Sequence, residues 1–332
     1  DHGNHLIRKI SIPPEHSQVA VTLFNLDDET DDATITLASS DTGEATVSPS
    51  SLTFNGNNWN TNQNVTVTGV NDNDRDRHQN FLIGLSASNQ LTDNPEVTTF
   101  AGSGSTGSTD ATGTSARFSS PMQTVSDGTN LYVADYLNHK IRKVVLSTGV
   151  VSTLAGSGSQ GSADGTGTSA TFSRPGGITL VGNNLYVLDV HGHKIRKILI
   201  ATGAVTTFAG SGSAGSTNGT GTSASFNYPS FITNDGTNLY VTDGSNHTIR
   251  KIVLSTGAVT TLAGNPGSAG TTNGTAAAAR FSSPHGITTD GTNLYVADRN
   301  NHKIRKIVLS TGVVSTLAGS GSQGSADATG TS

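Results

Sequence analysis

The chain has 332 residues, a net charge of −5 from 24 acidic and 19 basic side chains, and no cysteine. The absence of cysteine excludes disulfide frameworks and thiolate metal sites, and the negative net charge argues against a general nucleic-acid binder. No apolar run approaches the roughly 18 residues of a membrane-spanning helix, so no membrane span is expected.

The first recognisable element is the segment 4–9, Asn-His-Leu-Ile-Arg-Lys, because close copies of it recur along the chain. The copies occupy 138–143, 192–197, 246–251 and 301–306. Their arginines are 54, 54 and 55 residues apart, whereas Arg8 and Arg142 are separated by 134 residues, which is one period of 54 plus 80. A fixed period predicts a repeat architecture, and the extra residues predict an insertion in the first unit.

The inserted segment, residues 13–95, has the pattern of a separate all-β module. It carries 12 acidic and 2 basic side chains. Apolar and polar residues alternate in six stretches, as in half-buried strands. These stretches are 19–24, 33–37, 45–47, 52–54, 64–68 and 81–85. So many short strands in one small segment predict a β-sandwich.

Two acidic clusters lie in expected loops of the insert. The first contains Asp27, Asp28, Glu29, Asp31 and Asp32, and the second contains Asp72, Asp74 and Asp76. The candidate calcium ligands are Asp27, Asp28, Glu29, Asp72, Asp74 and Asp76. Ca²⁺ takes six to eight oxygen ligands, so carboxylate-rich loops suit it, and it is the one cofactor that the sequence suggests. Arg75 and Arg77 interrupt the second cluster, and a solvated acidic loop is the alternative interpretation.

From about residue 96 onward, each unit contains four short β-rich stretches separated by turn signals. The signals are Asp-Gly at 127–128, 235–236 and 290–291, and Ser-Thr-Gly at 147–149, 255–257 and 310–312. Asp-Gly favours a hairpin because the turn needs positive φ. Four antiparallel strands per repeat are typical of a propeller blade, and blades stack around an axis to bury their faces.

The repeats also carry a family resemblance. Each combines Pro-x-Gly-Ile, Leu-Tyr-Val-Ala-Asp, Asn-His-x-Ile-Arg-Lys and Thr-Leu-Ala-Gly, or close variants of them, and this pattern resembles the NHL-repeat β-propellers. The resemblance implies an all-β propeller of residues 1–12 and 96–332, with four full blades and strands three and four of a fifth. The insert would replace the turn between strands three and four of the first unit. Residues 48–54, Trp59 and 65–72 resemble the Calx-beta or cadherin-like modules of bacterial surface proteins, which bind calcium through such loops.

The incomplete fifth blade leaves two hypotheses. Either the chain is a segment of a longer protein whose flanks complete the ring, or a neighbouring subunit supplies the missing strands and the chain self-associates. An unpaired blade edge recruits partners.

The repeated Asp, His and Arg residues are candidates either for chemistry or for blade structure. They are Asp135, His139, Arg142, Asp189, His193, Arg196, Asp243, His247, Arg250, Asp298, His302 and Arg305. A tetrahedral metal site needs converging ligands, and ring symmetry keeps equivalent histidines apart. We therefore expect a structural motif, in which the Asp side chain bonds across the turn between strands two and three. For the basic residues, we expect solvation or pairing between blades rather than polyanion binding.

Propellers usually bind ligands at the central channel or on one face, and the starts of the first strands lie there. Gln123, Phe231 and His285 are the channel-mouth candidates. Lyases that resemble this family carry convergent histidine and carboxylate ligands, whereas these positions offer only His285. We therefore expect a non-enzymatic, extracellular or cell-surface binding or scaffolding module, adhesin-like or part of a filament. Its partner would be a protein, a surface glycan or a second copy. A channel lyase or hydrolase and a calcium-dependent adhesion module are the alternatives.

Overall fold

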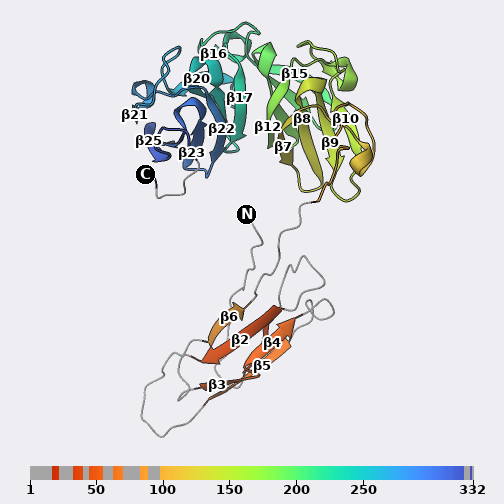
Figure 1. Cartoon of the computed structure of the whole chain (residues 1–332), viewed down its shortest axis with the longest axis vertical. Helices are drawn as coiled ribbons and strands as arrows, with labels where there is room; N and C mark the ends of the chain where they lie inside the picture. The colour runs from red at the N-terminus through yellow and green to blue at the C-terminus, as the bar shows by residue number, and fades with distance from the viewer. Residues whose placement is uncertain are drawn as a thin grey trace. The chain divides into compact units, whose positions relative to one another are not determined.

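The computed structural model describes residues 17–21, 33–39, 45–54, 63–69, 83–88, 98–324 and 330. The chain divides into two compact units, Asp1–Val97 and Thr98–Ser332, which are described separately (Figure 1). In the described residues, no helix is long and apolar enough to cross a membrane.

The first unit contains two antiparallel three-stranded sheets. One has the order β1-β5-β3 and the other β4-β2-β6. Their bounds are β1 (Ser17–Val21), β2 (Ala33–Ser39), β3 (Ala45–Ser48), β4 (Ser51–Phe54), β5 (Gln63–Gly69) and β6 (Ile83–Ser88). These strands overlap all six stretches expected from the alternating pattern. Leu37 and Leu52 from one sheet and Val65 from the other are buried. The six acidic residues suggested for calcium lie outside the described residues.

The second unit contains four blades, numbered here in chain order. Blade 1 has β7 (Pro121–Ser126), β8 (Asn130–Asp135), β9 (Lys140–Val145) and β10 (Val151–Ala155). Blade 2 has β12 (Pro175–Val181), β13 (Asn184–Asp189), β14 (Lys194–Leu199) and β15 (Ala204–Ala209). Blade 3 has β17 (Pro229–Asn234), β18 (Asn238–Asp243), β19 (Thr248–Val253) and β20 (Ala258–Ala263). Blade 4 has β22 (Pro284–Thr289), β23 (Asn293–Asp298), β24 (Lys303–Val308) and β25 (Val313–Ala318).

The four blades confirm the predicted all-β propeller and its four full strand sets. In each blade the strands pair antiparallel in sequence order. The two-residue strands β11 (Gly165–Thr166), β16 (Gly219–Thr220) and β21 (Gly274–Thr275) pair with the outer strands of blades 2, 3 and 4. The expected fifth blade stays a prediction, because residues 1–12 and Val97 lie outside the described residues and Thr98–Phe100 form no strand.

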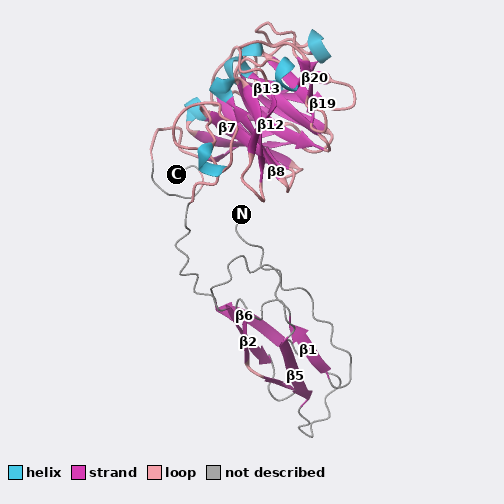
Figure 2. Ribbon diagram, turned by 90° about the vertical axis from the view of Figure 1, so that its right-hand side faces the viewer, coloured by secondary structure: helices cyan, strands magenta, loops and turns pink. Residues whose placement is uncertain are grey.

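The inner strands β7, β12, β17 and β22 pack side by side in chain order, as Figure 2 shows for β7 and β12. Between blades 1 and 2, Tyr132 and Ile141 pack with Phe172, Ile178 and Leu185, and all five side chains are buried. Each large apolar side chain removed from water contributes about 1.5–3 kcal/mol. The contact between blades is therefore the main hydrophobic core of this unit.

Antiparallel pairing places the turns between strands two and three on one face of the propeller. These turns are η2 (Tyr136–Asn138), η4 (Val190–Gly192), η6 (Gly244–Asn246) and η8 (Arg299–Asn301), each a 3₁₀ turn followed by a histidine. The histidines have φ between 52° and 60°, in the left-handed region. We call this side of the propeller the histidine face.

Candidate functional site

The repeated arginines are buried inside the blades. Arg142 Nη1 donates to Asp135 Oδ2 at 2.8 Å, Arg142 Nη2 donates to Asp110 Oδ1 at 2.5 Å, and neither Arg142 nor Asp135 is exposed. The guanidinium carbon also lies 5.0 Å from the centroid of the Phe118 ring. The equivalent pairs are Arg196–Asp189 at 3.0 Å, Arg250–Asp243 at 2.9 Å and Arg305–Asp298 at 2.8 Å. The expectation of solvated or inter-blade pairing is wrong for these arginines, because each pairs with an aspartate of its own blade.

The repeated aspartates tie the turn to the start of the blade. Asp135 Oδ1 accepts the backbone N–H of Ser119 at 2.8 Å, and Asp135 Oδ2 accepts Asn138 Nδ2 at 2.8 Å. The Asn138 amide also donates to the carbonyl of Gly107 at 2.6 Å. Burial raises the pKa of Asp189, and burial raises that of Asp243 to about 6. These carboxylates are therefore structural and closed to solvent.

The repeated histidines join consecutive blades. His139 Nδ1 accepts the backbone N–H of Arg174 at 3.1 Å, and His193 Nδ1 accepts that of Tyr228 at 3.2 Å. His247 Nδ1 accepts the N–H of Ser283 at 3.1 Å. Burial lowers the pKa of His139 and of His193, which keeps the accepting nitrogen unprotonated. The described residues contain no group of three potential metal ligands.

The channel-mouth candidates do not form a catalytic set. Gln123 Nε2 donates to the carbonyl of Ile232 at 3.2 Å, and Gln123 Oε1 accepts the N–H of Ile178 at 3.1 Å, so this side chain links three inner strands. The ring centroids of Phe231 and His285 lie 4.5 Å apart. Burial, with a nearby Arg299, lowers the pKa of His285. No carboxylate among the described residues hydrogen-bonds or ion-pairs with His285.

A cluster that sequence reasoning missed lies on the histidine face. It consists of Tyr136, Arg174, His191 and Tyr228, and we call it the face cluster. Tyr136 Oη and Arg174 Nη1 each lie 3.3 Å from His191 Nε2. The His191 and Tyr228 rings meet edge to face at 5.0 Å. These residues come from blades 1, 2 and 3, at positions where the repeat units differ from one another.

The protonation state of His191 follows from these contacts. A guanidinium can only donate, so Nε2 of His191 must accept from Arg174. Burial, followed by the charges of Arg174 and His193, lowers the pKa of His191. The imidazole is therefore neutral near pH 7, and Arg174 supplies the cluster's positive charge.

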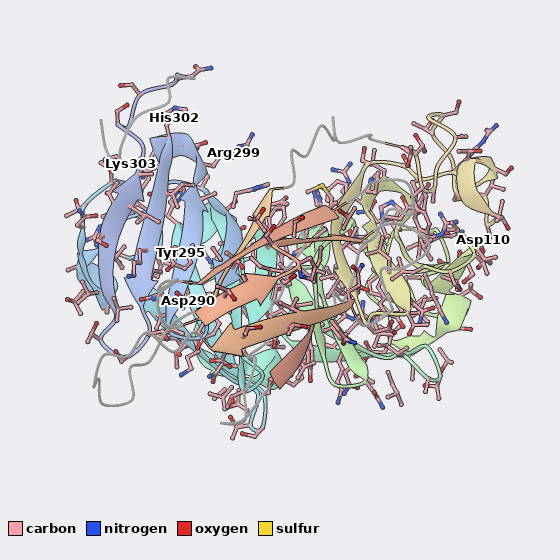
Figure 3. The ribbon with its side chains drawn as sticks, turned by 90° about the horizontal axis from the view of Figure 1, so that it is seen from below. Asp110, Asp290, Tyr295, Arg299, His302 and Lys303 are labelled. Carbon is pink, nitrogen blue, oxygen red and sulfur yellow. The ribbon has the colours of Figure 1, made fainter. Side chains whose placement is uncertain are left out.

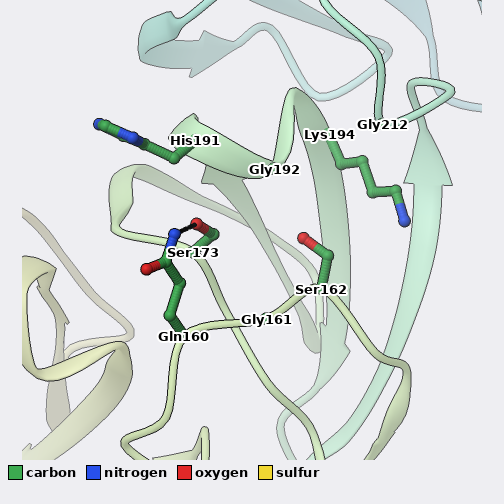
Figure 4. Close-up of a pocket in the computed structure, with 8 residues that line it drawn as sticks. All are labelled: Gln160, Gly161, Ser162, Ser173, His191, Gly192, Lys194 and Gly212. Atoms are coloured by element: carbon green, nitrogen blue, oxygen red, sulfur yellow. Dashed lines mark hydrogen bonds between the residues drawn. The ribbon is translucent and has the colours of Figure 1, made fainter.

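A pocket of about 460 Å³ adjoins the face cluster. Its walls are Gln160, Gly161, Ser162, Ser173, His191, Gly192, Lys194 and Gly212. Figure 4 shows His191 and Lys194 at opposite sides of the pocket, with Gln160 bonded to Ser173. Ser162 Oγ donates to the buried Asp189 Oδ2 at 2.6 Å. The pocket is therefore polar, and His191 connects it to the face cluster.

Basic side chains lie at the histidine face, and three aspartates lie in the turns of the opposite face, on the side toward third-strand lysines such as Lys197. Arg174, Arg299, Lys194 and Lys303 lie at the histidine face, where the described aspartates are buried. Asp127, Asp235 and Asp290 lie in the turns of the opposite face. Figure 3 shows Arg299, His302 and Lys303 at one end of blade 4 and Asp290 toward the other. The histidine face is thus cationic.

Comparison with known proteins agrees with this fold. The NHL repeat model matches residues 281–307, in blade 4. The chain is 32% identical over 239 aligned positions to Protein SUPPRESSOR OF QUENCHING 1, chloroplastic, of Arabidopsis thaliana, covering 66% of this chain and 22% of that protein. It is 31% identical over 239 positions to NHL repeat-containing protein 2 of Homo sapiens, covering 61% of this chain and 33% of that protein.

Among solved structures, virginiamycin B lyase from Staphylococcus aureus aligns with a TM-score of 0.39 and 18% identity, over 60% of this chain and 55% of that one. The chain spans about a fifth to a third of the curated relatives' lengths. The matched repeat and the curated relatives support an NHL-like β-propeller, whose four described blades are seen in the structure.

Proposed function

We propose that this chain is a non-enzymatic binding and scaffolding module that holds a glycan on its histidine face. One observation carries the proposal: the repeated Asp and Arg residues are buried in ion pairs that build the blades. The polar side chains that differ between blades gather instead in the face cluster. Side chains at positions where the repeat units differ are not needed to build every blade, so they are available to recognise a partner.

The chemistry of the face cluster suits a saccharide. Tyrosine combines an apolar ring with a polar tip, and Tyr228 is 42% exposed. Arg174 and the neutral His191 add hydrogen-bonding groups beside it. A sugar offers both hydroxyls and apolar ring faces, so the cluster matches both parts of it.

We also propose an extracellular or cell-surface location and identify the first unit as a Calx-beta or cadherin-like sandwich inserted in the propeller. The low proportion of charged residues, 13%, and the resemblance of residues 48–54 and 65–72 support this. Calcium binding, adhesion and filament formation belong to the same proposal. Self-association is supported by Ile304, which is 40% exposed although its equivalents Ile141, Ile195 and Ile249 are fully buried.

The test is electrophoresis of the whole chain through native gels containing polygalacturonate, xylan or dextran. We expect retardation in at least one gel and no release of soluble sugar. Tyr228→Ala should reduce the retardation several-fold, whereas Lys197→Ala, away from the histidine face, should not. Equal migration in all gels and in a polysaccharide-free gel would refute glycan binding, and release of sugar fragments would identify an enzyme.

A further inference from the structure

Blade 2 lacks an asparagine that the other described blades use in the same way. Asn138, Asn246 and Asn301 each donate one amide group to the blade's aspartate and to a glycine carbonyl. In blade 2 this position is Gly192. The change removes two hydrogen bonds and the volume of a side chain from one place on the histidine face.

One of the two lost bonds is replaced and the other is not. The Ser162 hydroxyl donates to Asp189 Oδ2 at 2.6 Å, where an asparagine amide would otherwise lie. A Cβ at Gly192 would overlap Ser162 Oγ and would lie only 2.7 Å from Asp189 Cγ, so both side chains must shift before a larger residue fits there. The carbonyl of Gly161, equivalent to that of Gly107, receives no hydrogen bond from a described residue. The pocket therefore contains a free acceptor.

On the side of the pocket opposite His191, the side chain of Lys194 supplies a cation. In blade 4, Lys303 Nζ donates to Thr271 Oγ1 at 2.9 Å. In blade 2 the equivalent hydroxyl, Ser162, is committed to Asp189, and Lys194 forms no hydrogen bond or ion pair with the described part of the chain. Asp189 lies beside the pocket, but its charge is matched by Arg196 at 3.0 Å. The pocket thus pairs an unmatched ammonium with an unmatched carbonyl.

We propose that this pocket binds a carboxylate-bearing saccharide residue, a uronic acid within an acidic polysaccharide. The carboxylate accepts from Lys194, in a charge-assisted bond stronger than one between neutral groups, and a sugar hydroxyl donates to the Gly161 carbonyl. His191 belongs to both the pocket and the face cluster, so neighbouring sugars meet Tyr228. This inference rests on the glycan-binding function proposed above and specifies its substrate class.

The experiment titrates the whole chain with trigalacturonate, maltotriose and sodium acetate by calorimetry. We expect trigalacturonate to bind at least tenfold more tightly than maltotriose, and acetate to give no heat at the same concentration. Lys194→Gln should weaken trigalacturonate binding at least tenfold. Lys140→Gln, the equivalent change in blade 1, should leave it unchanged.

Gly192→Asn provides the sharpest variant because it restores the residue of the other described blades. Blades 1 and 3 accommodate the same asparagine beside Ser108 and Ser216, so Ser162 and Asp189 should shift to fit it and the unfolding temperature should stay close to that of the unchanged chain. The asparagine should donate to the Gly161 carbonyl, as its equivalents do in the other described blades, and occupy part of the pocket, which should abolish trigalacturonate binding. Unchanged binding in this variant would overturn the pocket, and equal affinity for maltotriose or acetate would overturn the uronate specificity. If Tyr228→Ala weakens polysaccharide binding while Gly192→Asn does not, the proposed function stands and this inference falls.

Discussion

Arg250 Nη1 lies 2.9 Å from Asp243 Oδ2, and neither side chain is exposed to solvent. Nη2 of the same arginine donates to the carbonyl of Thr217 at 3.1 Å and to Asn218 Oδ1 at 2.9 Å. One guanidinium therefore fastens Asp243 of blade 3 to the loop that arrives from blade 2. Its Cζ also lies 5.1 Å from the centroid of the Phe226 ring, in the contact between blades.

We predict that Arg250→Met destabilises the propeller by about 3–5 kcal/mol, because it leaves Asp243 buried without its counter-charge. Urea unfolding followed by circular dichroism measures the change. The double variant Arg250→Met/Asp243→Leu should recover a large part of the loss, since no charge is then left unpaired. Lys251→Met, on the same strand, should change stability by about 0.5 kcal/mol or less. Equal effects of Arg250→Met and Lys251→Met would contradict the structural role of the pair.

The second prediction concerns the histidine contact between blades. His247 and His302 occupy the same repeat position with φ of 60° and 52°, but only His247 accepts an N–H of a following blade among the described residues. His247→Ala should therefore cost about 1 kcal/mol more than His302→Ala, the typical worth of one hydrogen bond. Thermal unfolding of both variants gives the difference in stability. Both alanines would have positive φ, so the cost of that backbone conformation cancels in the comparison. Indistinguishable variants would rule out a stabilising contact.

How much of this could be predicted from the sequence depends on the range of each interaction. The strands of the four blades follow from local alternation and turn residues, so their positions were predicted. The partners of Arg142 could not be predicted in the same way, because Asp135 lies across a strand pair and Asp110 is 32 residues away. His139 and Arg174 come together only through the packing of two blades. The face cluster and the pocket leave a weak sequence signal, namely positions where the units differ, of which Gly192 is the clearest.

The third prediction concerns acid stability. Burial alone would raise the pKa of Asp235, but hydrogen bonds from Asn238, Tyr240 and the backbone of Thr237 outweigh it and lower the pKa to about 2. A lowered pKa in the folded state contributes stability above the unfolded value, near 3.9, and this stability is lost as pH falls through about 2. Asp235→Asn should therefore reduce the unfolding temperature at pH 6 more than at pH 2. A constant difference across this range would show that the ionised carboxylate does not stabilise the turn.

The last prediction compares two glycines of one loop. Gly264 has φ of 92°, and a Cβ there would lie 2.6 Å from the backbone oxygen of His247. Gly267 has φ of 73°, and a Cβ there would meet no atom within 4 Å. Gly267→Ala should cost about 1 kcal/mol, since an L-residue pays mainly for the left-handed backbone. Gly264→Ala must in addition push apart the loop and the turn that ends at His247, so its loss in chemical unfolding should be at least twice as large. Because His247 also bonds to blade 4, this variant should weaken the contact between blades 3 and 4, visible as faster amide exchange at Ser283, while Gly267→Ala leaves that exchange unchanged.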